Sequence, residues 1–201
     1  LVLSVDLLDL AVLIRGCVVV PDRELRVQYG IWTRSTGARG GCVVDGGAVR
    51  GGPGTLALIL VEGPGRVANC VLDGADTPLV ALTDGVPDAG SAGIVIGGLP
   101  GLSAPCEVVD CSVHSVGGAG VLVGVSGASD PQTTIRGVAV YGASRTTRGV
   151  WISAYVLTAR IEDCLIRDVR CEGVYVDPNA TSDVVGCVVT SPGRAYVDDP
   201  F

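Results

Sequence analysis

The stretch that decides the fold runs from Ile161 to Val176 and reads IEDCLIRDVRCEGVYV. Apolar residues occupy alternate positions on both sides of a short charged break, as in strands whose successive side chains point to opposite faces. A cysteine follows an aspartate in the first half, and a glycine opens the second half. Similar segments recur along the whole chain, so the sequence is that of a repeat protein.

Seven copies align on the position of Cys164. The residues at this anchor position are Cys17, Cys42, Cys70, Cys111, Val138, Cys164 and Cys187. Their spacings lie between 23 and 28 residues, except for one of 41. The long interval contains the Gly/Pro-rich segment 84–105, which we expect to be an inserted loop with its own short strand, GIVIG. Units of this length cannot bury an apolar face alone, so the copies must stack to form a continuous core.

The residue before each anchor is Gly, Asn or Asp: Gly16, Gly41, Asn69, Asp110, Gly137, Asp163 and Gly186. These residue types accept positive φ, so the position predicts a tight bend between two strands. A third strand follows after a variable loop, as in the Gly-Val-x-Val runs at Gly149 and Gly173. Three short strands per rung and about seven rungs predict an all-β fold, a single-stranded parallel β-helix. We expect residues 1–201 to form one domain, and the missing initiator Met suggests a processed chain or a fragment of something longer.

The charge distribution argues against a nucleic-acid partner. The net charge is −7, and the fourteen basic residues, all Arg, are scattered, whereas nucleic-acid binders need a clustered basic face. The first fourteen residues are apolar but contain Asp6 and Asp9 and lack a basic start. We therefore expect neither a signal peptide nor a membrane span there.

The pattern apolar-x-[Gly/Asn/Asp]-Cys-x-apolar, then a loop, then Gly-Val-x-Val, resembles the right-handed parallel β-helix of pectate lyases, polygalacturonases and many phage tailspikes. The resemblance covers about residues 11–198. It implies a right-handed solenoid, and it leaves function open, because that superfamily includes lyases, hydrolases, epimerases and inert spikes. It also implies that the Gly-Val-x-Val strands form the sheet on which family members usually carry their binding cleft.

The anchor cysteines are interpreted as a ladder of buried free thiols that act as small apolar residues. Stacked side chains point in parallel and not toward each other, as a disulfide requires, and no CxxC pair suggests zinc. Cys106 and Cys171 lie off this ladder, and bridges from Cys106 to Cys111 or from Cys164 to Cys171 stay open. His114 is expected to be a surface histidine. Asp45 and Asp73, each followed by Gly, are expected at equivalent outward sites as turn residues and not as a catalytic pair.

The x position of Gly-Val-x-Val gathers aromatic residues: Trp32, Ala57, Ala81, Leu122, Trp151, Tyr175 and Tyr196. We expect Trp151, Tyr175 and Tyr196 to form an outward binding stripe, with Asp177 and Asp198 beside it. Such a stripe suits a glycan, a protein interface, or burial beneath another part of the chain.

The expected function is that of a non-enzymatic structural or recognition module in a virion spike, decoration or cell-surface protein. The residues after the anchors support this, because they should point outward and most are apolar: Val18, Val43, Val71, Ser112, Ala139, Leu165 and Val188. Such a face favours self-association, for example as a trimer, or a place in a larger assembly. No cofactor or metal is expected for this module.

The alternative is a polysaccharide-active lyase, hydrolase or epimerase. The resemblance then implies Asp177, Asp198 and Arg194 as catalytic candidates, and Ca²⁺ for a lyase. The polygalacturonase aspartate pair and Arg-Ile-Lys motif are missing, and the chain has no Lys. Carboxylates one rung apart would also suit a retaining enzyme better than the inverting chemistry common in that family.

Overall fold

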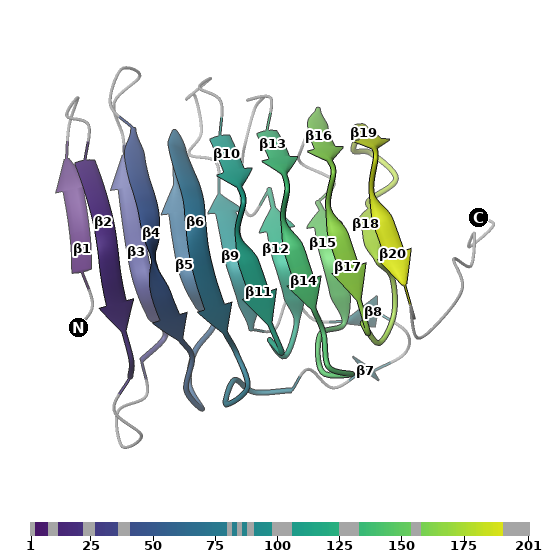
Figure 1. The fold of residues 1–201 in the computed structure, drawn as a ribbon, viewed down its shortest axis with the longest axis horizontal. Coiled ribbons are helices and arrows are strands. Elements are labelled where there is room, and N and C mark those ends of the chain that lie inside the picture. Colours follow the sequence, from purple (N-terminus) through teal and green to yellow (C-terminus); the bar gives the residue numbers. More distant parts are fainter. Residues whose placement is uncertain are drawn as a thin grey trace.

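In the computed structural model the described residues are 3–7, 12–21, 27–35, 41–79, 82–83, 86–87, 91–97, 106–124, 133–153 and 158–190. They contain strands and no helix. The strands form two walls that run along a solenoid, with the first and last strands at its opposite ends (Figure 1). The chain is therefore a parallel β-helix, as the repeat predicts.

The first wall is a seven-stranded sheet in which every neighbouring pair is parallel. Its strands, in spatial order, are β1 (Leu3–Leu7), β3 (Tyr29–Ser35), β5 (Ala57–Glu62), β9 (Ala92–Gly97), β12 (Ala119–Val123), β15 (Arg148–Ile152) and β18 (Val174–Val176). The segment 84–105 thus contributes β9 to this wall, and its GIVIG strand pairs with β5 on one side and β12 on the other.

The second wall is an eleven-stranded sheet that bends along its length. Three long strands cross the bend unbroken: β2 (Val12–Val19), β4 (Cys42–Arg50) and β6 (Gly65–Asp73). In later rungs the bend divides the strand into two, giving β10 (Cys106–Val109) and β11 (Ser112–His114), β13 (Thr133–Arg136) and β14 (Ala139–Tyr141), β16 (Ala159–Glu162) and β17 (Leu165–Arg167), and β19 (Ser182–Val185) and β20 (Val188–Thr190). The prediction of three strands per rung therefore holds only for the second half of the solenoid. A separate antiparallel pair joins β7 (Leu82–Thr83) to β8 (Val86–Pro87).

The number of turns that the solenoid makes is about five, which is fewer than the seven expected from the sequence. Seven strands stack in the first wall, but several connections that would close a turn lie outside the described residues.

The bend is made by one left-handed residue in every rung, with φ between 52° and 68°. These residues are Gly16, Gly46, Asn69, Asp110, Gly137, Asp163 and Gly186. The prediction is confirmed in six rungs and wrong in the second, where Gly46 and not Gly41 makes the bend.

The anchor of the second rung is likewise Gly47, not Cys42. Gly47 lies opposite Cys17 and Cys70, whereas Cys42 lies opposite Val12 and Gly65 at the start of its strand. A Cβ on Gly47 would lie 2.3 Å from the Cys17 carbonyl oxygen. This close approach explains why the second rung carries no anchor side chain.

The interior is filled by columns of branched residues, and one of them runs from Ile14 to Ile161 with exposures of 6% or less: Ile14, Val44, Val67, Val108, Ile135 and Ile161. The glycine of Gly-Val-x-Val lets the two walls approach each other. A Cβ on Gly149 would lie 2.5 Å from the Ile166 Cγ2 atom of the second wall. The recurrent Gly is therefore a packing requirement.

None of the eight cysteines forms a disulfide in the structure. The thiols at the bend also form hydrogen bonds, because each one donates to the backbone carbonyl oxygen of the residue two positions earlier. The Sγ–O distances are 3.2 Å from Cys70 to Ala68, 3.3 Å from Cys111 to Val109 and 3.2 Å from Cys164 to Glu162. The ladder is buried in its middle, whereas Cys17 is exposed and Cys187 half-buried.

Candidate functional site

The outward aromatic column of the first wall is largely as predicted. Trp32, Leu60, Val95, Leu122, Trp151 and Tyr175 occupy one register position. The prediction that Ala57 belongs to this column is wrong. Ala57 lies opposite Tyr29, and Leu60 lies opposite Trp32. Ala81 and Tyr196 lie outside the described residues.

The middle of this column is not exposed. Ala57, Ala92, Val95, Ala119 and Leu122 form a second apolar cluster, separate from the interior core, in which no residue is more than 7% exposed. Trp32, Trp151 and Tyr175 are half-buried. Accessible aromatic surface in the described column is therefore concentrated at its two ends.

At the β15–β18 end, Trp151 and Tyr175 lie opposite each other in neighbouring strands. Their ring centroids are 6.1 Å apart and their planes meet at 79°. The sequence predicts an outward stripe here, and the two rings are indeed adjacent. They pack edge to face and not as a flat ladder, so they do not offer two coplanar surfaces to successive sugar rings.

Arg148, the first residue of β15, joins these rings. Its guanidinium carbon lies 4.3 Å from the centre of the Trp151 ring and 3.7 Å from that of Tyr175. Its Nε donates a hydrogen bond of 3.0 Å to Glu172 Oε2. With only 3% of Arg148 exposed, these cation–π contacts are of the desolvated kind, worth about 2 kcal/mol.

One nitrogen of this arginine lacks a hydrogen-bond partner. Arg148 Nη1 is the only buried side-chain nitrogen or oxygen atom in the described part of the chain without one. Leaving a buried donor unpaired costs free energy. Arg148 was not among the residues predicted from the sequence, although its place directly before the Gly of Gly-Val-Trp-Ile and three residues before Trp151 could have marked it.

The carboxylate predicted beside the stripe is Asp177, which follows β18. Trp151 Nε1 donates to Asp177 Oδ2 at 3.4 Å. Burial, followed by the nearby Asp177 charge, raises the pKa of the Tyr175 hydroxyl, so this phenol is neutral at physiological pH. The other two catalytic candidates, Asp198 and Arg194, lie outside the described residues.

The other end of the column also has a hydrogen bond from an indole to a carboxylate. Trp32 Nε1 donates to Glu62 Oε2, again one strand further along the wall, at 2.9 Å. Tyr29 lies beside Trp32 with ring centroids 5.6 Å apart. The arginine between the rings belongs to the β15–β18 end. We name Arg148, Trp151, Glu172, Tyr175 and Asp177 the arginine–aromatic cluster.

The outer face of the second wall carries the apolar column predicted from the residues after the anchors. Its members are Val18, Ala48, Val71, Ser112, Ala139, Leu165 and Val188. The prediction that Val43 belongs to this column is wrong, because the second rung was aligned on Cys42 and its true anchor is Gly47. Val18, Val71 and Val188 are all more than half exposed.

Among the described residues, no carboxylate bonds to His114 to complete a Ser-His-Asp arrangement, and His114, which was predicted to be a surface histidine, is only partly exposed. It is half-buried on this wall, forms a hydrogen bond through Nε2 with Ser112 Oγ, and stacks on Tyr141 with ring centroids 4.9 Å apart. Asp73 lies opposite it in β6, but its carboxylate accepts a hydrogen bond from the Ala75 N–H and lies 3.9 Å from Arg50.

The two Asp-Gly sequences act as turns, but their sites are not equivalent. Asp45 lies opposite Arg15 and Ala68, whereas Asp73 lies opposite Arg50 and His114. Asp45 accepts hydrogen bonds from Asn69 and Arg15, which lower the pKa of its carboxyl group.

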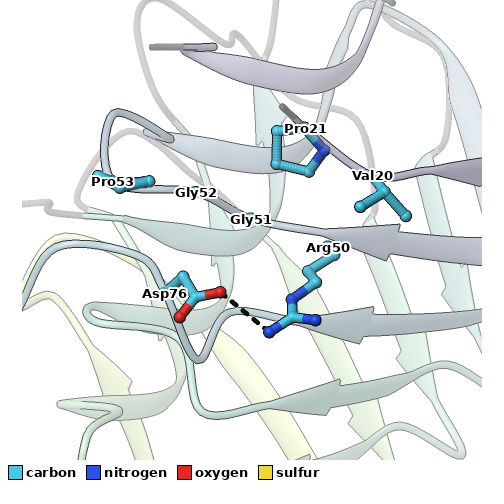
Figure 2. Close-up of a pocket in the computed structure, with 7 residues that line it drawn as sticks. All are labelled: Val20, Pro21, Arg50, Gly51, Gly52, Pro53 and Asp76. Atoms are coloured by element: carbon cyan, nitrogen blue, oxygen red, sulfur yellow. Dashed lines mark hydrogen bonds and ion pairs between the residues drawn. The ribbon is translucent and has the colours of Figure 1, made fainter. Parts of the chain in front are cut away.

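A shallow pocket lies where β2 and β4 end (Figure 2). It is lined by Val20, Pro21, Arg50, Gly51, Gly52, Pro53 and Asp76. Its two charged residues pair with each other, with Arg50 Nη2 3.0 Å from Asp76 Oδ2. The pocket therefore has a lining of mixed polarity, and its two charged side chains neutralise each other.

Within the described residues, no group of three His, Cys, Asp or Glu side chains is arranged to hold a metal ion. The same residues include no helix able to span a membrane. No protein-family model, curated protein or solved structure matches the chain.

Proposed function

We propose that the chain is a non-enzymatic recognition and structural module of the pectate-lyase-like β-helix superfamily, working in a virion spike, a decoration protein or a cell-surface protein. The observation that carries this proposal is the position of the Arg148 guanidinium between Trp151 and Tyr175. The buried Arg148 fixes the two half-buried rings on a rigid wall, and such a surface is suited to recognition because its geometry is set before a ligand arrives.

The carboxylates of the cluster favour binding over catalysis. Glu172 pairs with Arg148, and Asp177 accepts a hydrogen bond from the Trp151 indole N–H. A glycosidase needs two carboxyl groups that flank the scissile bond and exchange protons with it. In the arginine–aromatic cluster the carboxylates instead hold the arginine and the indole in place.

The ligand we propose is an oligosaccharide, which presents an apolar ring face and a rim of hydroxyl groups. The half-buried aromatic rings suit the apolar face of the sugar, and the charged side chains beside them suit its hydroxyl groups. The second wall adds a separate contribution, because its exposed Val18, Val71 and Val188 favour side-by-side assembly, for example as a trimer.

The test is a screen of acidic and neutral polysaccharides by affinity electrophoresis, with and without calcium. Ultraviolet absorbance and reducing ends are followed in the same samples. We expect binding without turnover. Tyr175→Ala should weaken binding about fivefold, the equivalent of the roughly 1 kcal/mol contributed by an aromatic pair.

Trp32→Ala is the matched control, because Trp32 occupies the same column and makes the same kind of indole–carboxylate bond, whereas the arginine near it, Arg34, lies 3.9 Å from the Glu62 carboxylate. This variant should bind as the unmodified chain does. Turnover that Asp177→Asn abolishes would reject the proposal and favour the polysaccharide-active enzyme.

A further inference from the structure

The chain has two asparagines, Asn69 and Asn179. Asn69 serves the bend of the second wall, because its φ is 56° and its side-chain amide donates a hydrogen bond of 2.8 Å to Asp45 Oδ1. Asn179 lies in the connection from β18 to β19 (Figure 1), where it is exposed. Asn69 thus belongs to the frame of the solenoid, whereas Asn179 belongs to its surface.

Asn179 begins the sequence Asn-Ala-Thr, which ends at Thr181. Asn-x-Ser/Thr, with x other than Pro, is the acceptor sequence for N-linked glycosylation. Asn69 is followed by Cys70 and Val71, so Asn179 is the one asparagine of the chain in such a sequence. The pattern is short, and its structural surroundings therefore decide whether it can serve as an acceptor, which has to lie on a surface loop.

The surroundings of Asn179 are those of a surface turn. The turn runs from Asp177 to Ala180 and is closed by a hydrogen bond of 2.8 Å from the Ala180 N–H to the Asp177 carbonyl oxygen. Pro178 occupies the second position, where its fixed φ suits a turn. Pro178, Asn179 and Thr181 are all exposed. A bulky sugar attached to Asn179 therefore meets solvent and not packed side chains.

Backbone hydrogen bonds to the preceding rung hold both ends of this segment. The Asp177 N–H donates to the Ile152 carbonyl oxygen at 2.9 Å, and the Ala159 N–H donates to the Thr181 carbonyl oxygen at 3.0 Å. These bonds use main-chain atoms, so they leave the Asn179 and Thr181 side chains out of the anchoring. Turn formation accounts for the proline and the asparagine, but it does not require a hydroxyl group at Thr181.

We propose that Asn179 is an N-glycosylation site, which receives an oligosaccharide from a lipid-pyrophosphate donor. In this transfer the Asn179 Nδ2 atom forms a bond to the anomeric carbon of the first sugar. The bond from that carbon to the pyrophosphate oxygen breaks, the lipid pyrophosphate leaves with the electron pair, and the amide gives up one proton. The Thr181 hydroxyl completes the acceptor sequence that the transferase recognises.

The inference rests on the part of the proposed function that places the chain at a cell surface or on a virion, because the transfer takes place in the secretory pathway. It does not rest on glycan recognition by the arginine–aromatic cluster. A bulky, hydrated oligosaccharide on Asn179 shields the corner between β18 and β19 from contact with other proteins.

The test is cell-free translation of the chain behind a cleavable secretion leader, with microsomal membranes that contain the transferase and its lipid-linked donor. We expect the protease-protected chain to exceed 20.3 kDa by the mass of one oligosaccharide and to lose it on digestion with peptide N-glycosidase. Asn179→Gln and Thr181→Ala should each abolish the addition, whereas Thr181→Ser, which keeps the hydroxyl group, should retain it. Because transfer acts on the chain as it enters the vesicle, a folding defect does not imitate its loss.

A second measurement tests the surface position. The purified glycosylated chain and Asn179→Gln should have the same β-type circular dichroism spectrum and the same midpoint of urea unfolding, and a lower midpoint for the glycosylated chain would contradict the exposed turn. A protease-protected chain without oligosaccharide, or an oligosaccharide that persists in Asn179→Gln, would overturn the proposal. The added leader supplies entry into the vesicle and no polysaccharide is present, so such a result concerns Asn179 and neither the location of the chain nor its recognition of glycans.

Discussion

The guanidinium carbon of Arg148 lies 3.7 Å from the ring centre of Tyr175, on the next strand of the first wall. This contact links a buried cation to a half-buried ring, and the Arg148 Nε atom also donates to the Glu172 carboxylate. The Trp32 end shares the indole–carboxylate bond. The two ends differ in Arg148, which is therefore the distinguishing residue of the cluster. A variant at Trp32 serves as the matched control for loss of the Tyr175 ring.

The register of the second rung can be tested by two glycine substitutions. Gly47→Ala should destabilise the protein by about 2 kcal/mol or more, because the new Cβ would lie 2.3 Å from the Cys17 carbonyl oxygen. Gly41→Ala should change the free energy of unfolding by less than about 0.5 kcal/mol, because the nearest atom, the Pro64 carbonyl oxygen, is 3.7 Å away. Urea unfolding measures both. Equal effects would contradict the register, and a larger effect at Gly41 would restore the alignment expected from the sequence.

The thiol ladder predicts a loss of stability at alkaline pH. Burial raises the pKa of Cys164 from its usual 9.0 to about 12. A raised pKa means that the folded state keeps a proton that the unfolded chain loses. The stabilisation is therefore complete below pH 9 and disappears as the pH rises toward 12, by about 1.4 kcal/mol per pH unit for one such thiol.

Cys164→Val is the variant that isolates this effect, since Val138 shows that valine fits the same column. Its free energy of unfolding should fall less steeply between pH 9 and 12 than that of the unmodified chain. An identical slope in the two proteins would show that Cys164 does not contribute.

Side-by-side assembly through the outer valine column can be tested by charge insertion. Val71→Glu and Leu165→Glu should lower the mass measured by light scattering and leave the β-type circular dichroism spectrum unchanged. Val43→Glu is the control, because the structure places Val43 in a different column, opposite Leu13 and Arg66. If all three variants have the mass of the unmodified chain, the column does not mediate association.

The fold could be predicted because its strongest signal is a local steric requirement. A left-handed bend accepts few residue types, and it recurs in every rung with Gly, Asn or Asp. The second rung was misaligned because Gly47 removes the anchor side chain, while Cys42, five residues earlier, supplies a false one. Arg39, three residues before Cys42, stood where an apolar residue was expected, whereas Val44, three before Gly47, fits that position.

The candidate site could be predicted only in part. The outward position of Trp151 and Tyr175 follows from strand alternation, which is a local rule. The perpendicular ring geometry and the burial of Arg148 depend on side chains from different strands, and no local pattern encodes them. The exposure of Val184 was likewise not predictable, because Val184 occupies the same repeat position as the buried Ile161.

The central claim is that the arginine–aromatic cluster is a recognition surface, and tryptophan fluorescence tests it most directly. Because the chain has two Trp residues, Trp32→Phe leaves Trp151 as the only tryptophan reporter. Titration with a polysaccharide that binds in the electrophoretic screen should shift Trp151 emission and saturate at the same concentration as binding, and Arg148→Gln should lose both responses together. Undiminished binding without any change in Trp151 emission, or full affinity in Arg148→Gln, would contradict the claim.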